Sequence, residues 1–137
     1  MKVQIINLDI YRRSVVILSD CCIGEVEKWL AEHDNADFIP TLNSVDWDST
    51  KAETMTDSLD IYVISLEPLN LPSLSHELSH AALKVLKIVG IDPIVAEEAY
   101  AYLFEYLITQ VTSSDGVLSL SLQDASLHTA QSQNGQS

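Results

Sequence analysis

Two short apolar runs, separated by a polar break, open the chain. Residues Lys2 to Asp9 and Ser14 to Leu18 are rich in Val and Ile, and Tyr11-Arg12-Arg13 lies between them. Short β-branched runs bounded by polar residues are typical of strands, so the pattern predicts two antiparallel strands joined by a tight turn. From about Gly24 to His33 the apolar residues recur with a helical period, which predicts an amphipathic helix.

The middle of the chain divides into a polar stretch and a second β-branched run. From Asp34 to Ser58 the residues are mostly Asn, Asp, Ser and Thr around Trp47, which predicts a long, exposed connection. The run from Asp60 to Leu66 is short, strongly apolar and followed by Pro68, which predicts a buried strand. We also expect this strand to offer an edge along which an extended peptide could pair.

Two helices are predicted next, and they form a hairpin. The first runs from about Pro72 to Val89, with proline in its first turn and Gly90 where a left-handed C-terminal cap belongs. The pair Asp92-Pro93 has the composition of an N-cap and first helical position, so the second helix is expected from there to about Gln110. The short turn should fold the second helix back against the first.

These elements predict one α+β domain over residues 1–113, followed by a C-terminal tail. The 137-residue chain is 47% hydrophobic, which is enough for one core and short for two domains. Residues 114–137 contain few large apolar side chains beyond Leu122, so we expect this segment to be a mobile tail.

The charge balance argues against two classes of partner. Twenty Asp and Glu residues against seven Lys and Arg give a formal charge of -13, which leaves too few cations to neutralise nucleic-acid phosphates or an anionic membrane surface. No stretch approaches the roughly 18 apolar residues of a membrane span. Cys21 and Cys22 are adjacent and poorly placed for a disulfide, and no signal-peptide pattern opens the chain, so a cytoplasmic location is predicted.

The motif that carries chemistry is His76-Glu77-Leu78-Ser79-His80. In a helix the two histidines lie on one face, one turn apart, where neutral imidazoles could share a Zn²⁺ ion. Glu77 is next to the first histidine, so its carboxylate could act as general base on a water molecule. The alternative is an ordinary exposed helix face with two polar residues and a solvated acid.

A catalytic zinc site needs a third protein ligand. Position 86 is Leu, so a third histidine six residues after His80 is absent, but the second helix carries Glu97 and Glu98 near its start. Glu98 shares a face with Tyr102 and Glu105, whereas Glu97 shares one with Phe104 and Ile108, and both faces border the apolar stripe. Helical phase therefore leaves the choice between the two glutamates open.

The stretch from His76 to Leu107, HELSHAALKVLKIVGIDPIVAEEAYAYLFEYL, resembles zinc-peptidase-like proteins of phages and prophages, a minimal branch similar to the gluzincins. The resemblance covers roughly residues 1–110 and implies a small zincin-like fold, with a short N-terminal β-sheet and a two-helix metal-binding core. It also implies that His76, His80 and Glu98 are the zinc ligands, Glu98 because it precedes an Ala-Tyr-Ala-Tyr run, and that Glu77 is the general base.

The chain departs from larger gluzincins at two places. An Asp that supports a metal-ligating histidine is replaced by Tyr102, and we expect no later subdomain that could supply a Tyr or His to the oxyanion. Tyr100, Tyr102 and His128 are the candidates for that part.

Three functions remain as hypotheses. The first is a zinc-dependent hydrolase, a metallopeptidase that acts on a peptide or protein substrate. The second is a catalytically silent zinc-binding structural or interaction protein. The third is an acidic helical adaptor in which the match to the motif is accidental.

Overall fold

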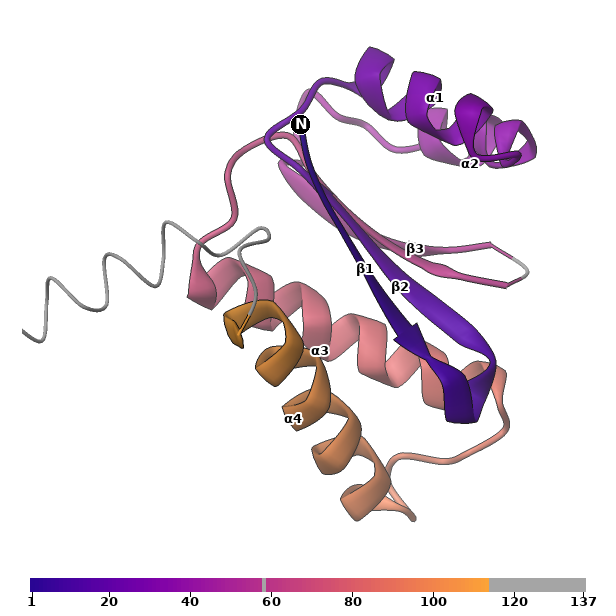
Figure 1. The fold of residues 1–137 in the computed structure, drawn as a ribbon, viewed down its shortest axis with the longest axis vertical. Coiled ribbons are helices and arrows are strands. Elements are labelled where there is room, and N and C mark those ends of the chain that lie inside the picture. The colour runs from indigo at the N-terminus through magenta and orange to yellow at the C-terminus, as the bar shows by residue number, and fades with distance from the viewer. Residues whose placement is uncertain (58, 114–137) are drawn as a thin grey trace, which may run out of the picture.

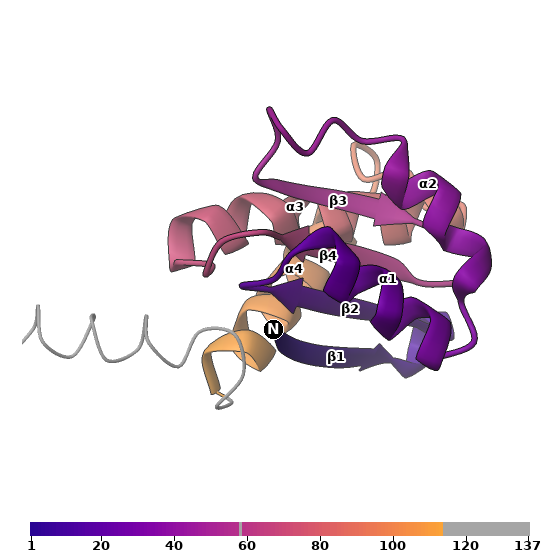
Figure 2. The same cartoon turned by 90° about the horizontal axis from the view of Figure 1, so that it is seen from above.

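A four-stranded mixed sheet separates two helical layers in the computed structural model, which describes residues 1–57 and 59–113 (Figures 1 and 2). The predicted α+β class is confirmed. The strands are β1 (Lys2–Leu8), β2 (Arg13–Ser19), β3 (Ala52–Thr56) and β4 (Ile61–Ser65). The helices are α1 (Ile23–Glu32), α2 (Ile39–Asn43), α3 (Leu71–Ile88) and α4 (Glu97–Ser113), with 3-10 turns η1 (Asp9–Tyr11) and η2 (Ala36–Phe38).

The strand order is β1-β2-β4-β3, with β4 parallel to β2 and antiparallel to β3. The predicted antiparallel pairing of β1 with β2 is confirmed. All five residues of β4 are buried, as expected of this run, but β4 is an interior strand. The expectation that it offers a sheet edge was therefore wrong, because both of its sides are already paired. The free edge on that side of the sheet belongs to β3.

The segment predicted as an exposed connection, residues 34–58, contains three elements instead. It forms η2, α2 and the edge strand β3, and it buries Phe38, Leu42 and Met55. The prediction failed because each element is at most five residues long. Such short elements contribute one or two apolar side chains each, which is too few to show a period among the surrounding Asn, Asp and Thr residues.

Helix α3, at Leu71–Ile88, begins and ends within one residue of the predicted bounds. The Asn70 side chain accepts a hydrogen bond from the Ser73 amide at 2.9 Å, which caps the N-terminus. At the other end Gly90 has φ +81°, its amide donates to Lys87 O at 3.2 Å, and the Ile91 amide donates to Leu86 O at 2.8 Å. These two bonds form a Schellman motif, which requires the left-handed conformation that glycine adopts without strain.

Helix α4 starts later than predicted. The Asp92 carboxylate accepts a hydrogen bond from the Ile94 amide at 2.9 Å, which closes a local turn, and the helix begins at Glu97. Asp92 and Pro93 were therefore wrongly placed as its N-cap and first residue, since an Asp-Pro pair also suits a turn. The predicted hairpin is confirmed, because Leu103, Leu107 and Val111 of α4 share one core with α3.

Two apolar cores lie on opposite faces of the sheet. Alternate strand residues point to each face, so neighbours along β2 and β4 belong to different cores. One core joins the sheet to α3 and α4, and contains Ile6, Leu8, Val15, Ile17, Ile61, Val63, Leu69, Leu74, Leu78, Ala81, Ala82, Val85, Leu86, Leu103, Leu107 and Val111. The other joins it to α1, η2 and α2, and contains Val16, Leu18, Cys21, Val26, Leu30, Phe38, Leu42, Met55, Tyr62 and Ile64.

Within the described part of the chain, no helix combines the length and apolarity needed to cross a bilayer. The predicted tail, residues 114–137, and with it His128, lies outside the described residues.

The two neighbouring cysteines should react very differently. Cys21 is 8% exposed, its thiol donates a hydrogen bond to Ser65 O at 3.3 Å, and burial raises the pKa of that thiol to about 11, whereas Cys22 is exposed. Because the thiolate is the reactive form, iodoacetamide at about pH 8 should add once to the folded protein, at Cys22, and twice in denaturant. Intact-mass and fragmentation spectra measure this, with Cys22→Ser as the control that should take up none when folded. Equal labelling of both residues in the native protein would contradict the placement of Cys21.

Candidate metal centre

A cavity of about 330 Å³ lies between the exposed side of α3 and the edge strand β3. It brings His76, Glu77 and His80 of the motif together with the start of the edge strand, two segments far apart in the sequence. Its lining residues are Ala52, Glu53, Thr54, His76, Glu77, His80 and Lys84.

The two histidine rings of the motif lie next to each other on α3, close enough for a hydrogen bond between their Nε2 atoms. Both side chains are exposed, and the Nε2 atoms of His76 and His80 are 3.3 Å apart. Two Zn–N bonds of about 2.0–2.1 Å at a tetrahedral angle place their nitrogens roughly 3.3 Å apart. The donor pair therefore fits zinc in both chemistry and spacing, and both rings are reachable from solvent.

Glu77 differs from an ordinary solvated helix acid, because its residue is only 8% exposed. The Thr54 hydroxyl donates a hydrogen bond to Glu77 Oε2 and also lies 3.1 Å from the Glu77 main-chain oxygen. A hydrogen bond to a charged group is stronger than one between neutral groups, so this contact fixes the carboxylate. Oε2 is thereby held toward β3, and Oε1 is the oxygen left to accept a proton from another molecule.

The structure does not bring either candidate third ligand to the histidine pair. Glu97 and Glu98 are both exposed in the first turn of α4, and neither lines the cavity. In residues 1–57 and 59–113, no three His, Cys, Asp or Glu side chains form a group that could hold a metal. The assignment of Glu98 as a ligand thus remains a prediction.

The burial of residues along α4 differs between the stripe that contains Glu97 and the stripe that contains Glu98. Phe104 and Ile108, on the stripe of Glu97, are partly buried against the core shared with α3. Tyr102, one turn after Glu98, is 67% exposed. The stripe that contains Glu97 thus becomes partly buried further along α4, whereas Glu97 and Glu98 are themselves both exposed.

Both tyrosines named as candidates for stabilising the oxyanion, Tyr100 and Tyr102, lie outside the cavity of the two histidines. The hydroxyl of Tyr100 is 2.6 Å from that of Ser79, inside the motif, so it joins α4 to α3 beside His80. Tyr102 lines a different cavity, on the β1 side of α4. Neither lines the cavity that contains the two histidines.

Sequence reasoning missed the contribution of β3 and of Lys84. Thr54 and Ala52 fall in the segment predicted as a connection, and the five-residue run Ala-Glu-Thr-Met-Thr has too little apolar alternation to identify a strand. Lys84 could have been found, since it follows His80 by one helical turn and so shares its face.

Comparisons with protein-family models, with curated proteins and with solved structures found no match to this chain. The arguments that follow therefore depend on the geometry and on the motif.

Removing the Thr54 hydroxyl should destabilise the fold. Thr54→Val keeps the shape of the side chain but leaves the buried Glu77 carboxylate without its donor, which should lower the free energy of unfolding at neutral pH by about 1–3 kcal/mol. Denaturant unfolding monitored by circular dichroism measures the change. Thr54→Ser, which retains the hydroxyl, and Thr56→Val on the same strand should each cost clearly less. A Thr54→Val protein as stable as the wild type would show that the contact contributes nothing.

Proposed function

We propose that this protein is a zinc-dependent peptidase whose metal centre is the cavity between α3 and β3. The observation that carries the proposal is the conjunction of two features in that cavity. The His76 and His80 nitrogens have the spacing of a shared zinc ion, and the buried carboxylate of Glu77 lies beside them. The resemblance of residues 76–107 to phage zinc-peptidase-like proteins agrees with this function.

In the proposed site His76, His80 and a glutamate from the first turn of α4 hold the ion. Three protein ligands leave one position open, which is the arrangement of catalytic rather than structural zinc. A zinc ion bound there would supply positive charge that polarises a peptide carbonyl and makes a water molecule acidic near neutral pH.

The edge strand β3 is suited to hold the substrate. The Leu66 amide donates to Lys51 O, and the Asp57 amide donates to Asp60 O, so the odd-numbered positions of this strand are the ones hydrogen-bonded to their partners in β4. In an antiparallel ladder the intervening residues then direct their N–H and C=O groups to the other side. Ala52 and Thr54 therefore present main-chain donors and acceptors at the free edge, beside the cavity, where an extended peptide could add as a further strand.

Glu77 is the proposed general base. Its Oε1 would accept a proton as the water oxygen bonds to the peptide carbonyl carbon, and would deliver that proton to the nitrogen as the C–N bond breaks. Thr54 keeps the carboxylate in position through Oε2. The histidines are exposed while Glu77 is recessed, so a substrate at the β3 edge would cover the base from solvent.

One observation favours the rival function, a zinc-binding protein without catalysis. Among residues 1–57 and 59–113, the cavity is lined by no tyrosine, and by no histidine other than the two ligand candidates. A donor to the oxyanion contributes several kcal/mol to catalysis in acyl-transfer enzymes, so a site without one would bind zinc and turn over slowly. An accidental motif, the third possibility, predicts no metal at all.

The metal site is tested by stoichiometry. Elemental analysis of the full chain, after zinc is supplied and the excess removed, should give about one zinc per chain. His76→Ala and His80→Ala should each lose most of that zinc. No transition metal in the wild type, or full zinc content in both histidine variants, would refute the site.

The same titration decides the third ligand with a matched pair of variants. The resemblance predicts that Glu98→Ala weakens zinc affinity by more than about tenfold, while Glu97→Ala changes little beyond a first-turn charge. The reverse result would transfer the ligand to Glu97. Unchanged affinity in both variants would eliminate a carboxylate ligand from α4.

Glu77→Gln separates the peptidase from the silent zinc protein. The amide oxygen of Gln can still accept the Thr54 hydrogen bond, so zinc content and unfolding should be retained, while cleavage of a library of quenched fluorescent peptides should fall by roughly 10²–10⁴-fold. If the zinc-loaded wild type shows no cleavage that a chelator abolishes, or if Glu77→Gln cleaves as fast as the wild type, the peptidase proposal fails.

A further inference from the structure

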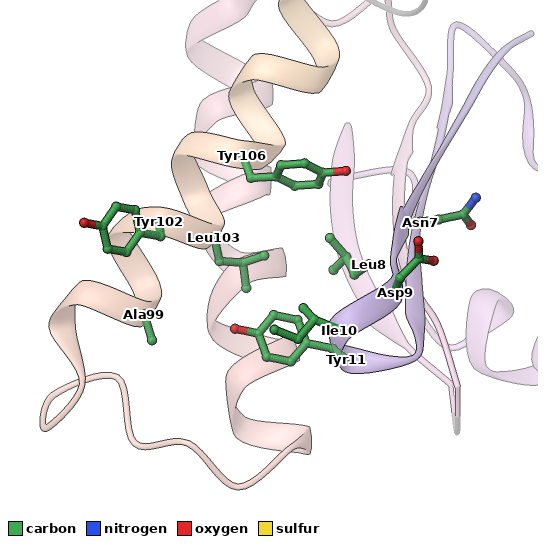
Figure 3. Close-up of a pocket in the computed structure, with 9 residues that line it drawn as sticks. All are labelled: Asn7, Leu8, Asp9, Ile10, Tyr11, Ala99, Tyr102, Leu103 and Tyr106. Atoms are coloured by element: carbon green, nitrogen blue, oxygen red, sulfur yellow. The ribbon is translucent and has the colours of Figure 1, made fainter.

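A second cavity, of about 400 Å³, lies on the other side of α4, between this helix and the end of β1 (Figure 3). We call it the tyrosine groove. It shares no lining residue with the cavity of the two histidines. Its lining residues are Asn7, Leu8, Asp9, Ile10, Tyr11, Ala99, Tyr102, Leu103 and Tyr106.

The tyrosine groove has an apolar floor and aromatic walls. Leu8 and Leu103 are buried at its base. In Figure 3 the Tyr106 ring extends from α4 toward the β1 segment, and the Tyr11 hydroxyl points back toward α4, so the two rings enclose the space from opposite sides. A concave, mostly apolar site with a few polar groups is the usual form of a binding site.

Several large apolar side chains at the groove, and two in the turn before α4, are exposed to an unusual degree. Ile10 is 86% exposed, Tyr102 67% and Tyr106 43%, and the turn that leads into α4 exposes Ile94 (83%) and Val95 (84%). Single exposed apolar residues are common on proteins, but the exposure of Ile10, Tyr102 and Tyr106 around one cavity marks an interaction surface. Tyrosine is also enriched at the centres of protein interfaces.

The charges around the groove indicate the sign of the charge that a partner should carry. Asp9 is the one charged residue among the nine that line it, and Glu98 and Glu105 lie one turn to either side of Tyr102 on the exposed stripe of α4. Arg12 and Arg13 line a neighbouring hollow together with Asp60, and Asn7 and Asp9 line both this hollow and the groove. A second copy of this chain would bring another charge of -13 against an acidic rim, which opposes self-association. A basic partner is attracted by the same field.

We propose that the tyrosine groove docks a short basic segment of a partner protein. An aliphatic or aromatic side chain of that segment enters the cavity between Tyr11 and Tyr106, and flanking Lys or Arg side chains contact Asp9 and Glu105. The tyrosine faces add cation–π attraction for those cations. The proposal does not rest on the zinc site, because the two cavities are lined by different residues.

Selection from a random decapeptide library displayed on phage, with the full chain immobilised, tests the proposal. The enriched peptides should combine one large apolar residue with two or more Lys or Arg residues, and should bind the free chain saturably in fluorescence anisotropy. Tyr102→Ser should weaken that binding at least tenfold. Its matched control is Leu83→Ser, an exposed apolar position (39%) on α3 that should leave affinity unchanged. Tyr102 is mostly exposed, so its loss should leave the fold intact, and circular dichroism verifies this.

Charge is tested separately with Asp9→Asn and Glu105→Gln, which should each weaken the selected peptides several-fold and reduce the dependence of affinity on salt. Lack of enrichment, enrichment of acidic peptides, or equal affinity for Tyr102→Ser would each overturn the proposal. Two results would assign the groove to another occupant and overturn it as well. One is a dimer in sedimentation that Tyr102→Ser dissociates. The other is tighter peptide binding after Leu118, Leu120 and Leu122 are all replaced by Ser, which would make the chain's own C-terminal segment the competitor.

Discussion

The burial of one face of α3 against the sheet is the constraint on which the candidate metal centre depends. Leu74, Leu78, Ala81 and Val85 are fully buried, and their packing fixes the rotation of the helix about its axis. Once that rotation is fixed, the His76–His80 pair must face outward. Glu77 falls at the boundary, where it meets Thr54 of β3. A different rotation would bury the imidazoles or separate the Glu77 carboxylate from Thr54. The same packing of α3 on the sheet therefore determines both the core and the position of the site residues.

Helices and strands that are long enough to show a hydrophobic period were predictable from the sequence. Those that form because of contacts with distant parts of the chain were not. The β-branched runs of β1, β2 and β4 and the periodic faces of α1 and α3 each contain enough residues to show a period. Strand β3 is recognisable only beside β4, because its pairing comes from main-chain groups that any residue could supply. The first turn of α4 was misplaced for a related reason, since Asp92 can cap a helix or close a turn, and the packing of α4 on α3 selects the turn.

The candidate site likewise has features that local sequence predicts and features that depend on contacts between distant segments. The spacing of His76 and His80 on one helix predicts their juxtaposition, because helix geometry is local. The hydrogen bond from Thr54 to Glu77 joins residues 23 positions apart in the sequence and depends on the register of an edge strand, so no local pattern contains it. The third ligand is the hardest feature to predict from the sequence, because the prediction requires both the rotation of α4 about its axis and the position of α4 along α3.

Within residues 1–57 and 59–113, the sheet has two unpaired edges, β3 on one side and β1 on the other, and this affects how copies of the chain behave together. Unpaired strand edges are templates for adding another strand, and β1 also exposes Val3 (40%) and Ile5 (50%). The charge of -13 counters this tendency at neutral pH, because copies repel one another before their edges can meet. That protection comes from carboxylates, so it weakens as acidification toward about pH 4 neutralises them. The colloidal stability of the protein is therefore tied to pH through its surface acids, and acidic conditions expose the edges to association even where the fold itself survives.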